Sequence, residues 1–238
     1  MHSFRYDDLA SVKTGDIVTL EKSENNHLFK ILRASEGDEI RLLDGKGKNA
    51  IARVEKSRTL VITEIQDIAP LPGAKLHLFL APPRRQKTDQ ILKQCTELGV
   101  ASITPVICER SVSLPEKDSV EGRWNELLFE ACKQSGNPYL PLLSPPVPFA
   151  AGVKKSLELC DKSFYGSIAE EKIIPSGEND REEDIAWFVG PEGGFTGEEE
   201  EYMRNAGFLP LHMQCWVLRA ETAAICGLAL LRERFSRK

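Results

Sequence analysis

The chain has 238 residues, which is enough for one large domain or two small ones. Its composition, 41% hydrophobic and 28% charged, is that of an ordinary globular protein, and no apolar run is long enough to predict a membrane span. The formal net charge of −5 disfavours a nucleic-acid partner. However, residues 170–184 carry about all of this excess negative charge, and the rest of the chain is near neutral. We expect that stretch to be a solvated loop, and basic clusters at residues 84–87 and 232–238 leave phosphate binding possible.

The six cysteines are scattered, without the CxxC or Cys/His spacing of a metal site. They are Cys95, Cys108, Cys132, Cys160, Cys215 and Cys226. Five lie within apolar strand or helix patterns, so we expect small buried thiols and no metal. The amino terminus lacks a secretory h-region, and a reducing, cytoplasmic location fits both observations.

The first 72 residues are predicted to form a small β-barrel, because short β-rich runs recur at regular spacing. The runs cover residues 16–20, 39–43, 49–54 and 59–65, with a hairpin-type turn at 44–47. Residues 25–33 are expected to form one short helix lying on these strands. Pro70 to Gly73 marks a linker, so the predicted domains are residues 1–72 and 73–238.

After the linker, strands alternate with helices, which predicts βαβ units and a parallel sheet. The expected strands are 76–80, 102–108, 163–168, 185–189 and 209–213. The expected helices cover 88–98, 124–135, the residues after Thr196, and 220–235.

Residues 185–201 form the most informative segment. An apolar strand stops at the Gly/Pro-rich loop 190–194, and a helix follows through a capping box of Thr196 and Glu199. Such a loop is where an open α/β sheet holds a ligand. The spacing is neither GxGxxG nor a P-loop, and the acidic residues 198–201 would repel a phosphate. A neutral or positively charged ligand suits this loop better.

The last predicted helix is apolar on every side from Ala223 to Leu231, so it must be covered all round. The cover is either a partner subunit, which we expect for a domain of this size, or the rest of its own chain. Just before it, Arg219 and Glu221 lie at the edge of an apolar interior, where a charged side chain needs either an ion-pair partner or a functional role. Either Glu221 and Thr222 cap the helix while Arg219 pairs with a carboxylate, or these residues belong to a reactive site.

Two segments, Gly190-Pro-Glu-Gly-Gly-Phe195 and Leu218-Arg-Ala-Glu-Thr-Ala223, resemble the small-subunit ribosomal RNA methyltransferase E family, a branch of the SPOUT (α/β-knot) methyltransferases. Further matches run in the right order through nearly the whole chain. They are Arg33, Leu43-Asp-Gly45-Lys-Gly47, Glu97 to Pro105, Glu109-Arg-Ser-Val112 and Ala131 to Gly136.

The resemblance implies an α/β protein with an N-terminal PUA-like β-barrel that binds RNA and a C-terminal SPOUT α/β domain with a trefoil knot. It also implies a homodimer, formed through the knotted domain and the C-terminal helix. The implied reaction is methylation of N3 of a specific uridine in small-subunit (16S) ribosomal RNA, with S-adenosyl-L-methionine as methyl donor.

By resemblance, this cofactor lies on the backbone of two loops and on neighbouring residues. The expected contacts are Gly190, Pro191, Glu192, Gly193, Gly194, Met213, Gln214, Val217, Leu218 and Thr222. Uridine N3 is a poor nucleophile until its proton leaves, so the reaction needs negative charge on O2 and O4 to be stabilised. Arg219 is the candidate stabiliser, while Glu221 either accepts the proton or orients Arg219.

The chain departs from the family pattern at Met213-Gln-Cys-Trp216, where members usually show Leu-Gly-x-Arg. Gln214 replaces a glycine near the cofactor. Trp216 replaces an arginine and offers a stacking or apolar wall in place of a charge.

Basic residues after the strand that ends at Ala81 are candidates for RNA phosphate contacts, although a solvated basic loop has the same pattern. The candidate RNA-binding residues are Arg5, Arg33, Arg84, Arg85, Lys87, Arg110 and Gln134. The leading hypothesis is a ribosomal RNA uridine N3-methyltransferase. The alternatives are a non-catalytic RNA-binding or ribosome-assembly protein with the same fold, and a SPOUT methyltransferase acting on another RNA.

Overall fold

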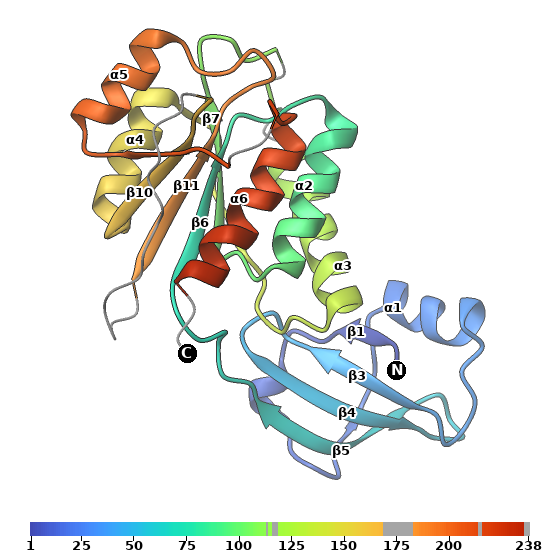
Figure 1. Ribbon diagram of the computed structural model, residues 1–238. Coiled ribbons are helices and arrows are strands. Elements are labelled where there is room, and N and C mark those ends of the chain that lie inside the picture. Colours follow the sequence, from blue (N-terminus) through green and yellow to red (C-terminus); the bar gives the residue numbers. More distant parts are fainter. Residues whose placement is uncertain (113, 116–118, 169–182, 214–215, 236–238) are drawn as a thin grey trace. The chain divides into compact units, whose positions relative to one another are not determined.

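The computed structural model describes residues 1–112, 114–115, 119–168, 183–213 and 216–235. The predicted loop at 170–184 therefore lies almost wholly outside the described residues. The chain divides into two compact units (Figure 1). The first consists of Met1–Pro70 and Phe129–Leu140, and the second of Leu71–Leu128 and Pro141–Lys238.

The first unit is built on a five-stranded sheet in the order β1-β3-β4-β5-β2. The strands are β1 (Ser3–Arg5), β2 (Ile17–Val18), β3 (Glu39–Leu43), β4 (Lys48–Val54) and β5 (Leu60–Asp67). Only the β1–β3 pair is parallel among those described. Alternate residues such as Ile40, Leu42 and Ile62 face a common core that also buries Phe4 and Leu28.

The short helices of this unit differ from the single predicted helix at 25–33. They are η1 (Leu9–Ser11), α1 (Lys22–Asn26) and a π-helical turn, η2 (His27–Ile31). The chain leaves η2 at Arg33, whose φ of 56° lies in the left-handed region.

Residues 129–140, which include the end of α3 (Asn125–Ser135), complete the first unit. The Leu140 amide donates to the Gly45 carbonyl at 2.9 Å, and the Tyr139 hydroxyl donates to the Ile68 carbonyl at 2.5 Å. The Lys133 ammonium, whose side chain is 7% exposed, donates to Glu24 at 2.8 Å. The first unit therefore includes residues 129–140, which are separated in sequence from the rest of it by about sixty residues.

The second unit is the predicted parallel sheet, in the order β12-β10-β11-β6-β7-β8, with β9 also paired to β7. Its strands are β6 (Lys75–Leu80), β7 (Ser102–Ile107), β8 (Leu142–Leu143), β9 (Val147–Pro148), β10 (Lys162–Gly166), β11 (Asp184–Val189) and β12 (Leu209–Leu211). Its helical elements, besides the start of α3, are α2 (Arg85–Glu97), η3 (Ser119–Trp124), α4 (Phe149–Leu159), α5 (Gly197–Asn205) and α6 (Ala220–Arg234).

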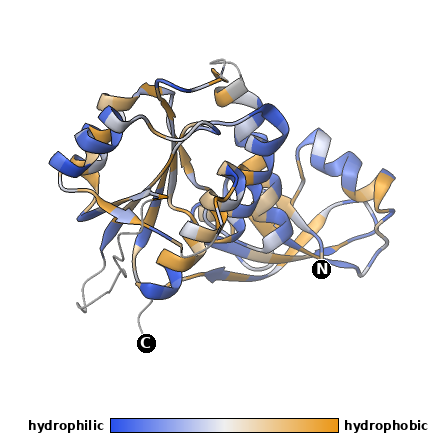
Figure 2. Cartoon of the chain, turned by 45° about the horizontal axis from the view of Figure 1, so that its top comes forward, coloured by the Kyte–Doolittle hydropathy of each residue, from blue (hydrophilic) through white to orange (hydrophobic). Residues whose placement is uncertain are grey.

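The helices cover both faces of this sheet, as the alternating pattern predicts. The helices α2 and α6 lie side by side over one face, and α4 and α5 pack on the other, where Phe79 and Phe188 stack (Figure 1). Each helix carries both hydrophilic and hydrophobic residues in Figure 2, as expected for helices with one buried side. Four elements, α4, β1, β8 and β9, are not predicted by the sequence pattern.

The last helix, α6, packs on the sheet through a glycine. Gly227 lies directly against the fully buried ring of Trp187 on β11, where any Cβ would overlap the indole. At the end of the helix, Arg232 donates to the carbonyls of Ala74 at 2.6 Å and Gly99 at 2.8 Å, and burial lowers the pKa of its guanidinium. Arg232 is therefore a structural residue and not part of a solvated basic cluster, and residues 236–238 of that cluster lie outside the described residues.

Within the described part of the chain, only one side of α6 is covered by other residues. Ala224, Gly227, Leu228 and Leu231 are buried, whereas Cys226 on the opposite side is exposed. Next to Cys226, the partly exposed residues Ile225, Ala229 and Leu230 extend the apolar surface. The sequence predicts that this apolar side is buried, but no segment in the described part of the chain packs on it.

The cysteines for which side chains are described are free thiols. Burial raises the pKa of Cys95, Cys108, Cys132 and Cys160 to about 12, so these groups are inert at neutral pH. Cys215 lies outside the described residues. Within the described ranges, no helix is long and apolar enough to cross a bilayer, and no three His, Cys, Asp or Glu side chains gather as a metal site.

The contact between Gly227 and Trp187 predicts a large effect of Gly227→Ala. Alanine favours a helix over glycine by about 1 kcal/mol, but overpacking a rigid indole costs about 1–3 kcal/mol or more. We expect a lower thermal midpoint by calorimetry. The matched control is Gly197→Ala at the start of α5, where a Cβ meets nothing within 4 Å, and it should unfold like the wild type. An unchanged midpoint for Gly227→Ala would contradict this packing.

Candidate functional site

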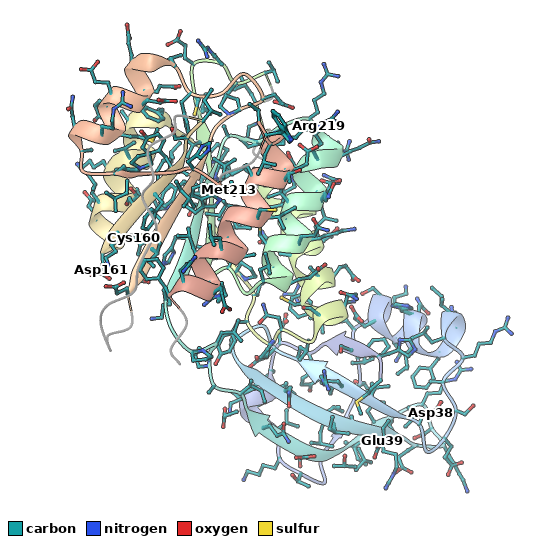
Figure 3. All side chains as sticks on the ribbon, viewed as in Figure 1. Asp38, Glu39, Cys160, Asp161, Met213 and Arg219 are labelled. Carbon is teal, nitrogen blue, oxygen red and sulfur yellow. The ribbon has the colours of Figure 1, made fainter. Side chains whose placement is uncertain are left out.

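The carboxyl ends of the parallel strands meet at one edge of the second sheet, and the segments that follow them carry most of the predicted site. Residues 81–84 follow β6, residues 108–111 follow β7, residues 190–196 follow β11 and residue 213 follows β12. The helix α6 also begins at this edge, and Figure 3 labels Arg219 at its start. This is the usual ligand-binding edge of an open α/β sheet.

The loop after β11 exposes its backbone to solvent. Glu192, Gly193 and Gly194 are exposed, while Pro191 is buried beneath them. The Gly194 amide donates to the Pro191 carbonyl at 2.8 Å, and its φ of 69° requires a glycine in practice. A Cβ on Gly194 would meet nothing within 4 Å, so this stretch of backbone faces open space. Gly190 is needed for packing, because a Cβ there would crowd Phe195 at 3.2 Å.

The predicted capping box at the start of α5 is confirmed. The Thr196 hydroxyl accepts from the Glu199 amide at 3.1 Å, and Glu199 Oε2 accepts from the Thr196 amide at 2.9 Å. Glu199 is buried, and its second oxygen, Oε1, accepts from the Glu109 amide after β7 at 2.9 Å. One carboxylate therefore caps the helix and joins it to the end of another strand.

Arg110, a predicted RNA contact, lies beside the glycine loop. Its Nη1 donates to the carbonyls of Gly193 at 2.9 Å and Phe195 at 3.3 Å. Its side chain also passes 3.3 Å from the position that a Cβ of Gly193 would occupy. The guanidinium thus fixes the carbonyls of Gly193 and Phe195 and holds this segment in place.

At the start of α6, Arg219 is the N-cap residue and its side chain is exposed. Two residues later, Glu221 Oε1 pairs with Lys87 Nζ of α2 at 3.2 Å, with side chains 12% and 29% exposed. Burial raises the pKa of Glu221, but a bond to its own backbone amide, the pair with Lys87 and the charge of Arg219 outweigh it, so the pKa is lowered overall. Glu221 is therefore ionised near neutral pH.

The other expected cofactor residues lie at the same edge or in the first turn of α6. Met213, Leu218 and Thr222 are partly buried, and Val217 is 79% exposed. Gln214 lies outside the described residues. Trp216 is 93% exposed, so its indole projects into solvent and does not fill the site.

The remaining RNA candidates fall into both units. Arg84 and Arg85 are exposed at the start of α2 in the second unit. In the first unit, Arg33 and Gln134 are exposed, and Arg5 pairs with Asp7 at 2.6 Å and lies 4.8 Å above the ring of Phe129. Lys87, by contrast, already has an anionic partner in Glu221.

A buried Ser–His–Asp chain lies at the opposite edge of the sheet and was not foreseen. His77 Nδ1 lies 2.7 Å from Ser102 Oγ, and His77 Nε2 lies 2.8 Å from Asp184 Oδ1. Ser102 and His77 are 5% and 6% exposed, which excludes a substrate. The chain joins β7, β6 and β11 near their amino ends, so it is structural.

Comparisons with known proteins agree with this arrangement. Residues 69–232 match a family described as RNA methyltransferase domain, and residues 20–66 match one described as RNA methyltransferase PUA domain. Two relatives are called ribosomal RNA small subunit methyltransferase E. One, from Synechocystis, is 29% identical over 89% of this chain and 71% of its own. The other, from Aquifex aeolicus, is 28% identical over 97% of this chain and 99% of its own.

Among solved structures, the chain is similar to a ribosomal RNA small subunit methyltransferase E from Neisseria gonorrhoeae bound to S-adenosyl methionine. The TM-score is 0.85 at 27% identity, covering 98% of this chain and 97% of the other. The matched methyltransferase region contains the glycine loop, Arg110, Lys87 and the start of α6. The chain therefore belongs to the RNA methyltransferase domain family and carries the PUA domain associated with it.

Proposed function

We propose that this protein methylates N3 of a uridine in small-subunit ribosomal RNA and takes the methyl group from S-adenosyl-L-methionine. The observation that carries the proposal is the position of Arg219, an exposed cation at the start of α6, on the sheet edge that also bears the glycine loop. The names of the Synechocystis and Aquifex aeolicus relatives support the choice of ribosomal RNA.

The residues at this edge fit the cofactor. The exposed backbone of Glu192 to Gly194 has open space beside it, and the carboxylate of Glu192 suits a positively charged sulfonium. The Neisseria gonorrhoeae relative was solved with this compound. We propose that residues 190–194 hold it together with Met213, Gln214, Val217, Leu218 and Thr222. When bound, it supplies an electrophilic methyl group.

The protein's own contribution is to stabilise the charge that appears on the base. As the N3 proton leaves, negative charge spreads onto O2 and O4, and the guanidinium of Arg219 offers N–H donors to those oxygens. Glu221, ionised beside Lys87, either takes the proton or orients Arg219.

We propose that the N-terminal PUA-like domain, with Arg5 and Arg33, and the exposed Arg84 and Arg85 position the RNA through its phosphates. We also propose a homodimer in which a second copy covers the apolar side of α6 around Cys226, since that surface has no cover in the described chain. Light scattering at the mass of a single chain would refute the dimer. A trefoil knot in the second domain and a cytoplasmic location complete the proposal.

Mass spectrometry of ribosomal RNA from a deletion strain tests the function. We expect the loss of one methyluridine in small-subunit RNA and its return when the gene is restored. An unchanged modification map would refute the proposal. Calorimetry with S-adenosyl-L-methionine then separates the remaining candidates, because a non-catalytic RNA-binding protein should give no heat.

Arg219→Ala tests the proposed stabiliser. Removing a fixed donor to a developing oxyanion slows the chemical step by about 10²–10³-fold, and we expect at least that loss in single-turnover methyl transfer. Cofactor affinity by calorimetry should change little. The control Arg204→Ala, on the exposed side of α5, should react at the wild-type rate. Normal turnover by Arg219→Ala would remove Arg219 from the mechanism.

Arg110→Ala distinguishes two roles of one arginine. Loss of charge-assisted bonds worth about 1.5–3 kcal/mol should loosen the loop and weaken cofactor binding by about tenfold or more. RNA affinity by filter binding should stay near the wild-type value. The opposite result, with cofactor affinity intact and RNA affinity lost, would contradict this role. It would support the RNA contact that the sequence predicts for Arg110.

A further inference from the structure

The pair between Lys87 and Glu221 connects the first turns of the two helices that lie side by side over one face of the sheet. Lys87 belongs to α2 and Glu221 to α6, and the two helices pack side by side (Figure 1). Arg219 is the N-cap of the same turn that carries Glu221. Lys87 therefore fixes the turn that presents the proposed stabiliser.

The second oxygen of Glu221 has a different environment. Oε2 is inaccessible to solvent and has no hydrogen-bond partner among the described residues. A buried acceptor without a donor is unfavourable, so a working state that supplies a donor is favoured. Arg219 is the second cation, after Lys87, whose charge lowers the pKa of Glu221.

We propose that Lys87 is a positioning residue for methyl transfer: it holds Glu221 Oε1, so that Oε2 receives the guanidinium of Arg219 when RNA is bound. This inference rests on the proposed role of Arg219. It assigns Glu221 to the orientation of Arg219 rather than to removal of the N3 proton. In the free protein Arg219 is exposed, and the step to the working state is a rotation of its side chain.

The chemistry of the base supports this assignment. An efficient proton acceptor has a pKa near the working pH. Glu221 departs from that requirement, because its own backbone amide, Lys87 and Arg219 together lower its pKa despite burial. An acceptor that stays ionised holds a guanidinium well, since charge-assisted bonds are the stronger kind.

A double-mutant cycle tests the proposal. Lys87→Met should slow single-turnover methyl transfer by about tenfold to a hundredfold, the loss typical of a displaced catalytic group, with cofactor affinity unchanged. Lys87→Arg should restore most of the rate. If Lys87 acts through Arg219, adding Lys87→Met to Arg219→Ala should cause no further loss. A further loss of the same size in the double variant would overturn the proposal. The control is Lys93→Met, at an exposed position on the same helix.

Two more readouts separate orientation from proton removal. Glu221→Gln keeps an acceptor for Arg219 but cannot take a proton, so it should retain a measurable rate above that of Arg219→Ala. A rate equal to that of Arg219→Ala would identify Glu221 as the base and overturn the assignment.

The pH profile supplies the second readout. Lys87→Met removes a cation that lowers the pKa of Glu221, so Glu221 protonates at higher pH and the rate should fall earlier on acidification. If the rate of Lys87→Met falls at the same acidic pH as that of the wild type, the proposed coupling between Lys87 and Glu221 is contradicted. An inactive wild-type protein would overturn the proposed function together with this inference, whereas an active wild type with a normal Lys87→Met variant would overturn this inference alone.

Discussion

The ligand-binding edge of the second unit depends on how α6 lies on the sheet. Gly227 allows the helix to approach the Trp187 ring, and Arg232 fixes its far end to the carbonyls of Ala74 and Gly99. At the near end, Glu221 is joined to Lys87 of α2. A helix held at its middle and at both ends presents its first turn in one place. Such rigidity is what a charged group needs if it is to act on a developing charge.

The glycine loop is shaped in a similar way, by residues from another strand. Its own glycines permit the turn, but Arg110, in the segment after β7, holds the carbonyls of Gly193 and Phe195. The neighbouring Glu109 amide holds Glu199 of the helix that follows the loop. The carbonyls that would otherwise be free are occupied by the guanidinium. A loop rich in glycine would lose much conformational entropy on binding a ligand, and these contacts reduce that loss beforehand.

Strong local patterns predict their elements, whereas weak patterns and contacts between distant segments are not predictable from the sequence. The capping box of Thr196 and Glu199 lies within one turn, and the alternation of strands and helices is repeated many times, so both were predictable. The helix α4 was missed because Pro148 precedes it and Gly152, which weakens helical patterns, packs against Val106. The pair of Lys87 and Glu221 leaves no periodic trace, because its members are ordinary surface-type residues on separate helices.

The first unit is closed by a segment that is synthesised much later than the rest of it. Lys133, Tyr139 and Leu140 bond to residues of the first seventy, and Phe129 is buried there. During translation, at about 5–20 residues per second, the first unit therefore lacks residues 129–140 for several seconds. Over that interval Glu24, Gly45 and Ile68 lack these partners, and a fragment cut at the linker would lack them permanently.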